Sequence, residues 1–527
     1  MFKVLVCDPL SEEGLQPIRS NPQFQLDVLT NLSKDELFDR IGQYDALLVR
    51  SQTQVDAALL QAANKLQIIG RAGVGVDNID LKAATEQGIL VVNAPDGNTN
   101  SAAEHTMAML MALARNIPQA YLSLKNGNWD RKSFIGIELK GKTLGVIGLG
   151  RIGAEVAQRA KGQRMQVIAY DPFLSEEKAE KMGVKKGTVE EVVRAADFVT
   201  VHTPLLKETK HLLNAQAFAQ MKQGVYIINC ARGGIIDEEA LYEALQQGKV
   251  AGAALDVFEV EPFVDHKLLN LPQVIATPHL GASTVEAQEI VAVDVCDDVV
   301  RYFTGQAVKN PVNLSAVPKE VLQKVEPYLM LGEKLGSFIQ DVSQGIVQEL
   351  RVTYSGELQD FDVSPLTRNV VKGFLRSRLG ESVNEVNAKL FADRLGITII
   401  EQKTSQSKGF TSLLTVEVVA ENGTHKVAGT LVNGLGARIV RVDDFVVDVP
   451  LEAHLLFIQH LDQPGAIGRV GMSLAEERIN IASMQVGRAE KGGAAIMMLT
   501  VDKHVKPASV EKLTTLADIQ DVIAIEL

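Results

Sequence analysis

The sequence predicts an α/β protein with two doubly wound parallel sheets, followed by an α+β unit and a small ferredoxin-like unit. Short apolar runs alternate with helix-compatible stretches from the first residues onward, and this rhythm restarts near Lys142. After about residue 313 the alternation gives way to longer strands punctuated by glycine. At 527 residues the chain also exceeds what one hydrophobic core usually supports, so several domains are expected.

The composition is typical of a globular protein whose partner is a small molecule. Hydrophobic residues make up 46% and charged residues 22% of the chain, and the net charge of −12 argues against a nucleic-acid or anionic membrane partner. No apolar run reaches the length of a membrane span, and no signal-peptide pattern precedes the first strand. Three scattered cysteines, Cys7, Cys230 and Cys296, lack metal-ligand spacing. We therefore expect a cytoplasmic protein with reduced cysteines and no bound metal.

The first block, about 95 residues long, is predicted to form a parallel sheet. Apolar runs at residues 4–6, 46–49, 67–69 and 89–92 predict buried strands, and the polar stretch 34–41 predicts a helix between two of them. A further helix is expected to run through residues 102–114, with Thr99 or Ser101 as its N-cap.

The second block predicts six strands separated by helices, at residues 143–147, 167–170, 198–202, 225–230, 252–257 and 274–277. A long helix at 284–303 leads to a boundary near residues 309–313. In the third block one helix over 319–340 precedes strands that include 347–354, 413–419 and 438–442. From about residue 454 the order is strand, helix, strand, strand, helix, strand, which is typical of a ferredoxin-like domain.

A glycine motif follows the first strand of the second block. Gly148, Gly150 and Gly153 come directly after that strand and open a helix, where a dinucleotide site needs a tight turn, close pyrophosphate approach and close helix packing. Asp171 ends the next strand, at the place where an acidic residue binds the ribose of NAD. A 2′-phosphate about 4 Å from this carboxylate would be repelled by roughly 4 kcal/mol, so NAD is expected rather than NADP. The alternative is an ordinary glycine turn beside an unrelated aspartate.

Arg232, Glu261 and His279 each follow a predicted strand of the same sheet, so their side chains are expected at one edge. Singly they could be a turn arginine, a loop charge and a structural histidine. Together they suit the oxidation of a secondary alcohol. His279 would accept the hydroxyl proton, Glu261 would orient the imidazole and favour the imidazolium, and Arg232 would bind a carboxylate and the 2-oxygen.

At these residues the sequence resembles the D-2-hydroxyacid dehydrogenases, over residues 1 to about 312. The stretch 70–77 and the long C-terminal extension resemble the phosphoglycerate dehydrogenase branch of that family. The resemblance implies NAD-dependent oxidation of 3-phosphoglycerate, the first step of L-serine biosynthesis. It also implies a substrate domain split into 1–97 and 285–312 around a cofactor domain at 98–284, followed by an intervening domain at 313–452 and an ACT domain at 453–527.

Residues of the first block would bind the substrate. Arg50 and Arg71 follow strands and are natural phosphate ligands, with ordinary surface ion pairs as the alternative. The resemblance adds the substrate contacts Gly73, Val74, Gly75 and Asn98, and Arg131, which would reach a neighbouring subunit of a homodimer or homotetramer. It also implies further cofactor contacts from Arg151, Ile152, Thr203, Cys230, Ala231, Arg232, Asp256, His279, Gly281 and Ala282. Cys230 is either a redox-sensitive thiol or a small core residue.

The last block resembles the ACT domain, a small-molecule sensor. His460, Asp462 and Asn480 are expected to hold L-serine as an effector, beside a turn at Pro464 and Gly465 that could also be purely structural. Residues 313–450 resemble the intervening domain of long phosphoglycerate dehydrogenases. The stretch 386–389 departs from that family, which usually has proline after the alanine.

Two other functions remain open. A glyoxylate or hydroxypyruvate reductase, or a 2-hydroxyglutarate dehydrogenase, would use the same chemistry without needing the long tail. A transcriptional corepressor that senses NAD could be built on the same scaffold, although no basic or disordered extension favours it.

Overall fold

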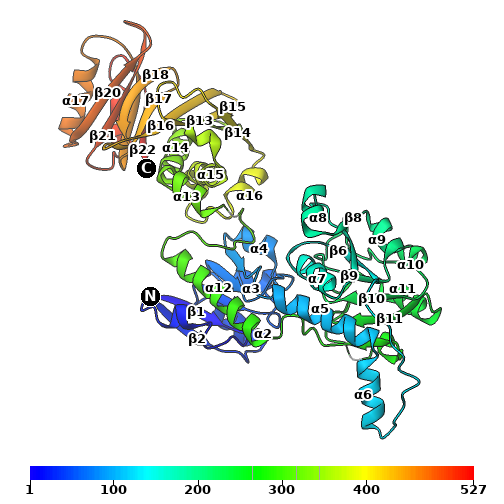
Figure 1. Ribbon diagram of the computed structural model, residues 1–527. Coiled ribbons are helices and arrows are strands. Elements are labelled where there is room, and N and C mark those ends of the chain that lie inside the picture. Colours follow the sequence, from blue (N-terminus) through cyan, green and yellow to red (C-terminus); the bar gives the residue numbers. More distant parts are fainter. Residues whose placement is uncertain (264, 316, 344) are drawn as a thin grey trace.

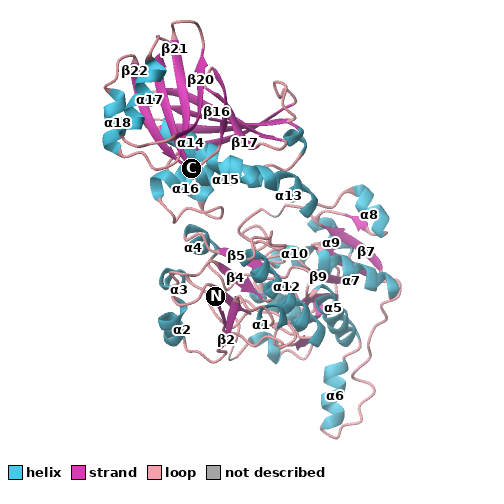
Figure 2. Cartoon of the chain, turned by 90° about the vertical axis from the view of Figure 1, so that its left-hand side faces the viewer, coloured by secondary structure: helices cyan, strands magenta, loops and turns pink. Residues whose placement is uncertain are grey.

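The computed structural model describes residues 1–263, 265–315, 317–343 and 345–527, and its strands form four sheets (Figure 1). The two parallel sheets lie at one end of the molecule, and the two sheets of the C-terminal half lie at the other (Figure 2). The predicted fold class is confirmed: two doubly wound sheets, an α+β unit and a ferredoxin-like ACT unit.

The first sheet is parallel, with strand order β2-β1-β3-β4-β5. Its strands are β1 (Phe2–Val6), β2 (Phe24–Val28), β3 (Ala46–Val49), β4 (Ile68–Arg71) and β5 (Leu90–Asn93), and its helices are α1 (Gln16–Arg19), α2 (Lys34–Ile41), α3 (Ala57–Ala62) and α4 (Leu81–Glu86). Every residue of β3 is buried, because helices cover both faces of such a sheet. Strand β2 was not predicted, since only Phe24 within it is buried and the strand therefore has no continuous apolar run.

The second sheet is also parallel, with order β12-β11-β10-β9-β6-β7-β8. Its strands are β6 (Thr143–Ile147), β7 (Gln166–Tyr170), β8 (Lys185–Lys186), β9 (Phe198–Val201), β10 (Val225–Asn229), β11 (Val250–Leu255) and β12 (Val274–Ala276). Its helices are α5 (Thr99–Ala114), α7 (Arg151–Gly162), α8 (Glu176–Met182), α9 (Val189–Ala195), α10 (Ala215–Gln220), α11 (Glu238–Gln246) and η1 (Lys267–Asn270). The expected six strands become seven, because the two-residue edge strand β8 is exposed and has no apolar signal. The strand order reverses between β6 and β9, where sheets of this type bind their ligands.

Two helices link the parallel sheets. Helix α5 packs on α7 and β11, whereas α12 (Val285–Phe303) returns to pack on β4, β5 and α1 of the first sheet. The predicted N-cap of α5 was wrong: Asn98 occupies that position, Thr99 is the first helical residue, and the Ser101 hydroxyl donates back to the carbonyl of Asn98. Helix α6 (Ile117–Lys125) projects from the body as an arm (Figures 1 and 2).

The third sheet, β14-β13-β15-β16-β17-β18, is mixed, since β13 and β14 are parallel and the other pairs are antiparallel. Its strands are β13 (Val347–Gly356), β14 (Thr398–Thr404), β15 (Ser412–Ala420), β16 (Gly423–Val432), β17 (Gly436–Val442) and β18 (Phe445–Pro450), and its helices are α13 (Lys319–Val325), η2 (Glu326–Tyr328), α14 (Leu329–Val342), η3 (Glu357–Asp360), α15 (Ser364–Leu379) and α16 (Ala388–Arg394). The single helix expected over 319–340 is interrupted. Pro327 lacks an N–H and lies in η2, which separates α13 from α14.

The ACT unit has the antiparallel order β20-β21-β19-β22. Its elements are β19 (His454–Leu461), α17 (Ala466–Glu476), β20 (Ile481–Arg488), β21 (Ala494–Val501), α18 (Pro507–Thr514) and β22 (Ile519–Glu526), in the predicted order. Leu455, Phe457 and Ile525 of this unit belong to the same hydrophobic core as Phe338 and Phe374 of the third sheet's helices. The α+β unit and the ACT unit therefore share one hydrophobic core.

Helices α14 and α15 approach each other through glycines. A Cβ on Gly336 would lie 2.1 Å from the carbonyl oxygen of Val370. We expect Gly336→Ala to lower the free energy of unfolding by about 1–3 kcal/mol, because the crossing has no room for a methyl group. Scanning calorimetry on the full chain measures the change in melting temperature.

Gly162→Ala in α7 is the control, since nothing lies within 4 Å of the added carbon. It should leave the melting temperature unchanged or raise it, because alanine favours helix. A Gly336→Ala protein that melts at or above the temperature of the Gly162→Ala protein would contradict the packing argument.

Candidate active site

The glycine turn after β6 leaves an open approach to the start of α7. Gly148 has φ +93° and lies so close to the carbonyl of His202 that a Cβ would be 2.4 Å from its oxygen. A Cβ on Gly153 would lie 2.0 Å from the carbonyl oxygen of Gly148, so this glycine lets the helix pack on the turn. Gly150 is the N-cap of α7, and nothing lies within 4 Å of its Cβ position. The turn therefore fits a pyrophosphate next to free helix N–H groups.

Asp171 follows β7, and its carboxylate stabilises the glycine turn. One oxygen accepts the N–H of Leu149 at 2.9 Å, and the other accepts the N–H of Phe173 at 2.8 Å. This structural role of Asp171 was not predicted, because the sequence motif describes only a contact of the carboxylate with the ribose. The carboxylate is thus fixed beside the turn before any cofactor arrives.

His279 and Glu261 form a hydrogen-bonded pair. His279 Nδ1 lies 2.7 Å from one carboxylate oxygen of Glu261, and the other oxygen accepts the N–H of Phe258 at 2.8 Å. Burial opposes ionisation of Glu261, but the hydrogen bonds from His279 and Phe258 outweigh it and lower the pKa of this carboxyl below its ordinary value. Glu261 is therefore ionised at neutral pH and can orient the imidazole through Nδ1.

Asp256 supports the loop that carries His279. It is fully buried, and its oxygens accept the N–H groups of Leu280 at 2.7 Å and Gly281 at 2.8 Å and the hydroxyl of Thr277 at 2.6 Å. Burial disfavours its charge, yet hydrogen bonds from His105, Thr277 and Leu280 keep its pKa below the ordinary value. No sequence pattern indicated this role. The predicted contact of Asp256 with the cofactor stays a prediction.

Three arginines gather beside the loop after β4. A Cβ on Gly73 would lie 1.6 Å from a guanidinium nitrogen of Arg71, and a Cβ on Gly75 would lie 1.9 Å from one of Arg232. Burial lowers the pKa of Arg71 to about 10, and the neighbouring cations Arg232 and Arg50 add to this shift. Arg232 comes from the second sheet, so the structure brings the two sheets' cationic residues together. Such a cluster favours an anion.

Part of this charge is balanced within the chain. The Arg232 side chain donates from Nε to Asp77 at 3.0 Å and from Nη1 to the carbonyl of Ala231 at 2.7 Å. The sequence indicated Asp77 only as part of the stretch 70–77, and its ion pair with Arg232 was not predicted. Three buried atoms, Arg71 Nε, Asn98 Oδ1 and Thr203 Oγ1, have no hydrogen-bond partner among the described residues. Unpaired buried polar atoms are rare in proteins, and a bound ligand is one way to satisfy them.

Apart from Arg131, the other predicted contacts lie in loops after strands or in the first turn of α7. Arg151 pairs with Asp96, Ile152 packs against the core, and Val74 accepts a hydrogen bond from Asn93 at 2.6 Å. The predicted positions Ala231, Gly281 and Ala282 lie in the loops that follow β10 and β12. Arg131 is exposed beyond the arm α6, in the same loop as the exposed Trp129, and in the described part of this chain it has no ion pair.

The structure favours a small buried core residue over a redox-sensitive thiol for Cys230. Burial, together with the charge of Asp256, raises the pKa of its thiol to about 12. It is therefore a neutral thiol at physiological pH and a poor nucleophile. Within the described ranges, no group of three or more His, Cys, Asp and Glu side chains is arranged to hold a metal ion.

Among the described residues, no hydrogen bond or ion pair joins the predicted effector residues His460, Asp462 and Asn480 to one another. Asp462 accepts hydrogen bonds from Arg488 and the N–H of Gly492, both at 3.2 Å, and these lower the pKa of its carboxyl. Asn480, one residue before β20 rather than within it, donates to Asp502 at 2.8 Å. His460 is buried in β19, and its Nε2 has no hydrogen-bond partner among the described residues.

Comparison with known proteins decides the family. The model of the NAD-binding domain of D-isomer specific 2-hydroxyacid dehydrogenases matches residues 107–281, that of the D-3-phosphoglycerate dehydrogenase intervening domain matches 324–443, and that of the ACT domain matches 454–518. A D-3-phosphoglycerate dehydrogenase of Bacillus subtilis is 49% identical over 527 residues, covering all of both chains, and one of Methanocaldococcus jannaschii is 45% identical over 528 residues with the same coverage. The chain belongs to the D-3-phosphoglycerate dehydrogenases.

Solved structures resemble the N-terminal part of this dehydrogenase. A Thermus thermophilus protein is 34% identical with a TM-score of 0.54, covering 59% of this chain and 99% of that protein. A D-lactate dehydrogenase of Aquifex aeolicus, solved with NAD and lactic acid, is 29% identical with a TM-score of 0.53, covering 60% of this chain and all of that protein. The predictions of an NAD-dependent D-2-hydroxyacid dehydrogenase and of NAD as its cofactor are confirmed.

The position of Asp171 in this dehydrogenase predicts which substitution weakens the preference for NAD over NADP. Asp171→Asn keeps a side-chain oxygen for the glycine turn and removes the charge that repels a 2′-phosphate. We expect its preference for NAD over NADP to fall at least about tenfold, as measured by kcat/KM with each cofactor.

Asp171→Ala is the comparison variant, because it removes the charge and also both hydrogen bonds to the turn. It should lose kcat/KM with both cofactors. If Asp171→Asn discriminates as strongly as the unaltered protein, the carboxylate does not select the cofactor.

Proposed function

We propose that this dehydrogenase oxidises D-3-phosphoglycerate to 3-phosphohydroxypyruvate with NAD, the first step of L-serine biosynthesis. The observation that carries the proposal is that Arg71 and Arg232 lie against a glycine loop, with Arg50 close enough to lower the pKa of Arg71. A substrate with both a phosphate and a carboxylate offers two anionic groups to these cations. A glyoxylate reductase or a 2-hydroxyglutarate dehydrogenase would need no phosphate site, and a corepressor would need no turnover at all.

The proposed roles follow from the atoms that each side chain presents. Arg232 binds the substrate carboxylate and stabilises charge on the 2-oxygen, while Arg50 and Arg71 bind the phosphate. His279 accepts the proton of the 2-hydroxyl at Nε2, because Nδ1 is engaged by Glu261. Bound NAD supplies the hydride acceptor. Closure of the two parallel-sheet units on each other would exclude water from this site.

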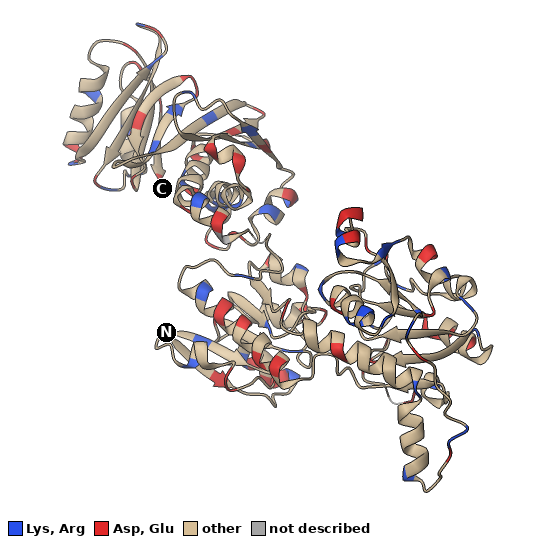
Figure 3. Ribbon diagram, in the orientation of Figure 1, with Lys and Arg blue, Asp and Glu red and all other residues tan. Residues whose placement is uncertain are grey.

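We also propose that the protein is a homo-oligomer in the cytoplasm. Helix α6 has no buried residue, carries only Lys125 as a charged side chain, and stands away from the body (Figure 3). The arm and the loop after it expose the apolar side chains Ile117, Tyr121, Leu122, Leu124, Trp129 and Ile135. A second copy of the chain would cover them and bring Arg131 to its active site. The three free, buried cysteines are consistent with a reducing compartment, and no helix in the described part of the chain could cross a membrane.

The Glu261 to His279 pair makes the pH dependence of the reaction testable. Oxidation requires an imidazole that can accept the hydroxyl proton, and the ionised carboxylate of Glu261 is hydrogen-bonded to Nδ1 of that imidazole. Glu261→Gln keeps an acceptor for Phe258 and removes the charge. We expect the pH profile of kcat/KM for 3-phosphoglycerate to change, because the charge beside the imidazole is lost.

His279→Ala should lower kcat by about 10²–10⁴-fold at all pH values, because it removes the acid-base group itself. An unchanged pH profile in Glu261→Gln would reduce Glu261 to a support for the loop. Near-normal turnover in His279→Ala, with NAD binding retained, would remove this residue from the mechanism.

We further propose that L-serine binds the ACT unit and inhibits the enzyme. Asp462 and Asn480 would hold the ammonium and the carboxylate of serine, at an interface between two ACT units that provides burial for so small a ligand. Inhibition requires only that serine binds one arrangement of the domains more tightly than another, by about 1–3 kcal/mol. Because the ACT unit shares a core with the third sheet, point variants test this better than truncation.

We expect Asp462→Ala and Asn480→Ala to remain active and to require at least about tenfold more L-serine for half inhibition. Asp502→Ala is a useful control, since it removes the intramolecular partner of Asn480 without removing a proposed ligand. The serine proposal fails if calorimetry on the full chain detects no binding at millimolar serine, or if both variants are inhibited as strongly as the unaltered protein.

A further inference from the structure

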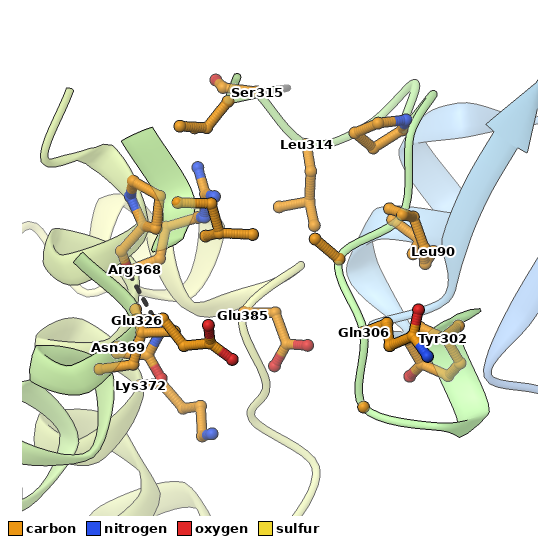
Figure 4. A pocket seen from close by; sticks show the side chains of 18 of the residues that line it. Leu90, Tyr302, Gln306, Leu314, Ser315, Glu326, Arg368, Asn369, Lys372 and Glu385 are labelled. Carbon is orange, nitrogen blue, oxygen red and sulfur yellow. Dashed lines mark hydrogen bonds between the residues drawn. The ribbon is translucent and has the colours of Figure 1, made fainter. Parts of the chain in front are cut away.

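A ligand-sized cavity lies between the first parallel-sheet unit and the α+β unit, and none of the residues proposed above for substrate, NAD or serine lines it (Figure 4). Its volume is about 600 Å³, within the range of small-molecule sites. One wall consists of Leu90 and the segment from Tyr302 at the end of α12 to Gln306. The opposite wall is α15, with Arg368 and Lys372.

Among the described residues, Arg368 is the cation of this cavity that forms no ion pair. Lys372, one turn along α15, is paired with Glu333 at 2.9 Å. Burial lowers the pKa of Arg368, and the charges of Asp362 and Glu385 oppose that shift. A partly buried guanidinium without a carboxylate against it is costly unless a ligand supplies the anion.

Glu385 supplies negative charge to the same space. Figure 4 shows its carboxylate between the two walls. Together with burial, its charge raises the pKa of Tyr302 to about 12, so Glu385 lies close enough to act on the far wall as well. Glu385 takes part in no ion pair with the described residues, and Glu326 adds a second carboxylate to the lining. The cavity therefore offers both signs of charge to one occupant.

The rest of the lining is largely apolar. Leu90, Phe303, Leu314 and Leu329 face the cavity from both walls. A purely ionic ligand would leave these side chains in contact with water, whereas an apolar group on the ligand would remove them from water and so strengthen binding.

We propose that this cavity binds an amino acid with an apolar side chain, its carboxylate on Arg368, its ammonium on Glu385 and its side chain against the leucines. The site is separate from the serine site proposed for the ACT unit. Helix α12 begins at Val285, shortly after the loop of His279, and ends at Tyr302 and Phe303 in the cavity wall. An occupant therefore joins the α+β unit to the helix that leads from the active-site loop, and it favours the arrangement of the two units that forms the cavity.

Isothermal titration of the full chain with L-leucine and with L-phenylalanine tests the proposal. At least one of them should bind saturably at up to millimolar concentration. The analogues 4-methylpentanoate, which lacks the ammonium, and 3-methylbutylamine, which lacks the carboxylate, should bind at least about tenfold more weakly than L-leucine. An absence of saturable binding by both amino acids overturns the proposal, and so does a carboxylate analogue that binds as tightly as the amino acid.

Variants locate the binding. Arg368→Gln and Glu385→Gln should each weaken amino-acid binding at least about tenfold, and Arg368→Lys should weaken it less, since it keeps the charge. Arg378→Gln is the matched control, an exposed arginine on the same helix that does not line the cavity. Unaltered affinity in both Arg368→Gln and Glu385→Gln overturns the assignment. If Arg368→Gln does not fold, Arg368→Lys and Glu385→Gln carry the test. Activity without an amino acid should be normal in every variant, so this inference can fail while the proposed function stands.

Discussion

The only partly balanced positive charge at the boundary between the two parallel sheets is the constraint on which the candidate active site depends. Arg71 and Arg232 come from different sheets and approach the same glycine loop so closely that side chains on Gly73 and Gly75 would collide with them. Mutual repulsion disfavours such a cluster, and Asp77 offsets only part of it. The site is thus prepared for an anionic ligand, and the binding of that ligand would relieve the repulsion.

Much of the site could be predicted from sequence because local rules place it. Glycines after a strand and polar residues beyond strand ends have fixed positions in a doubly wound sheet, so Gly148, Asp171 and His279 could be singled out. Contacts between residues far apart in the chain could not. The hydrogen bonds from Leu280 and Gly281 to Asp256 depend on how two loops of the second sheet meet. The pairing of Arg232 with Asp77 depends on how the two sheet units pack, and no periodicity encodes either contact.

The C-terminal half illustrates the same limit. The order of elements in the ACT unit was predicted, since strand and helix periods are local. The break at Pro327 was missed, although the proline is visible in the sequence, because the apolar spacing continues across it. Phe457 of the ACT unit shares a hydrophobic core with Phe338 of α14, and this contact arises only in the tertiary structure. Side chains of the ACT sheet therefore pack directly against the α+β unit.

The most direct test of this account compares 3-phosphohydroxypyruvate with unphosphorylated hydroxypyruvate as substrates for reduction by NADH, measured spectrophotometrically in the unaltered protein and in Arg50→Gln and Arg71→Gln. If these arginines bind phosphate, kcat/KM for the phosphorylated substrate should fall at least about tenfold more than kcat/KM for the unphosphorylated one. Equal losses on both substrates would show that the arginines serve the structure rather than the phosphate, and would contradict the account.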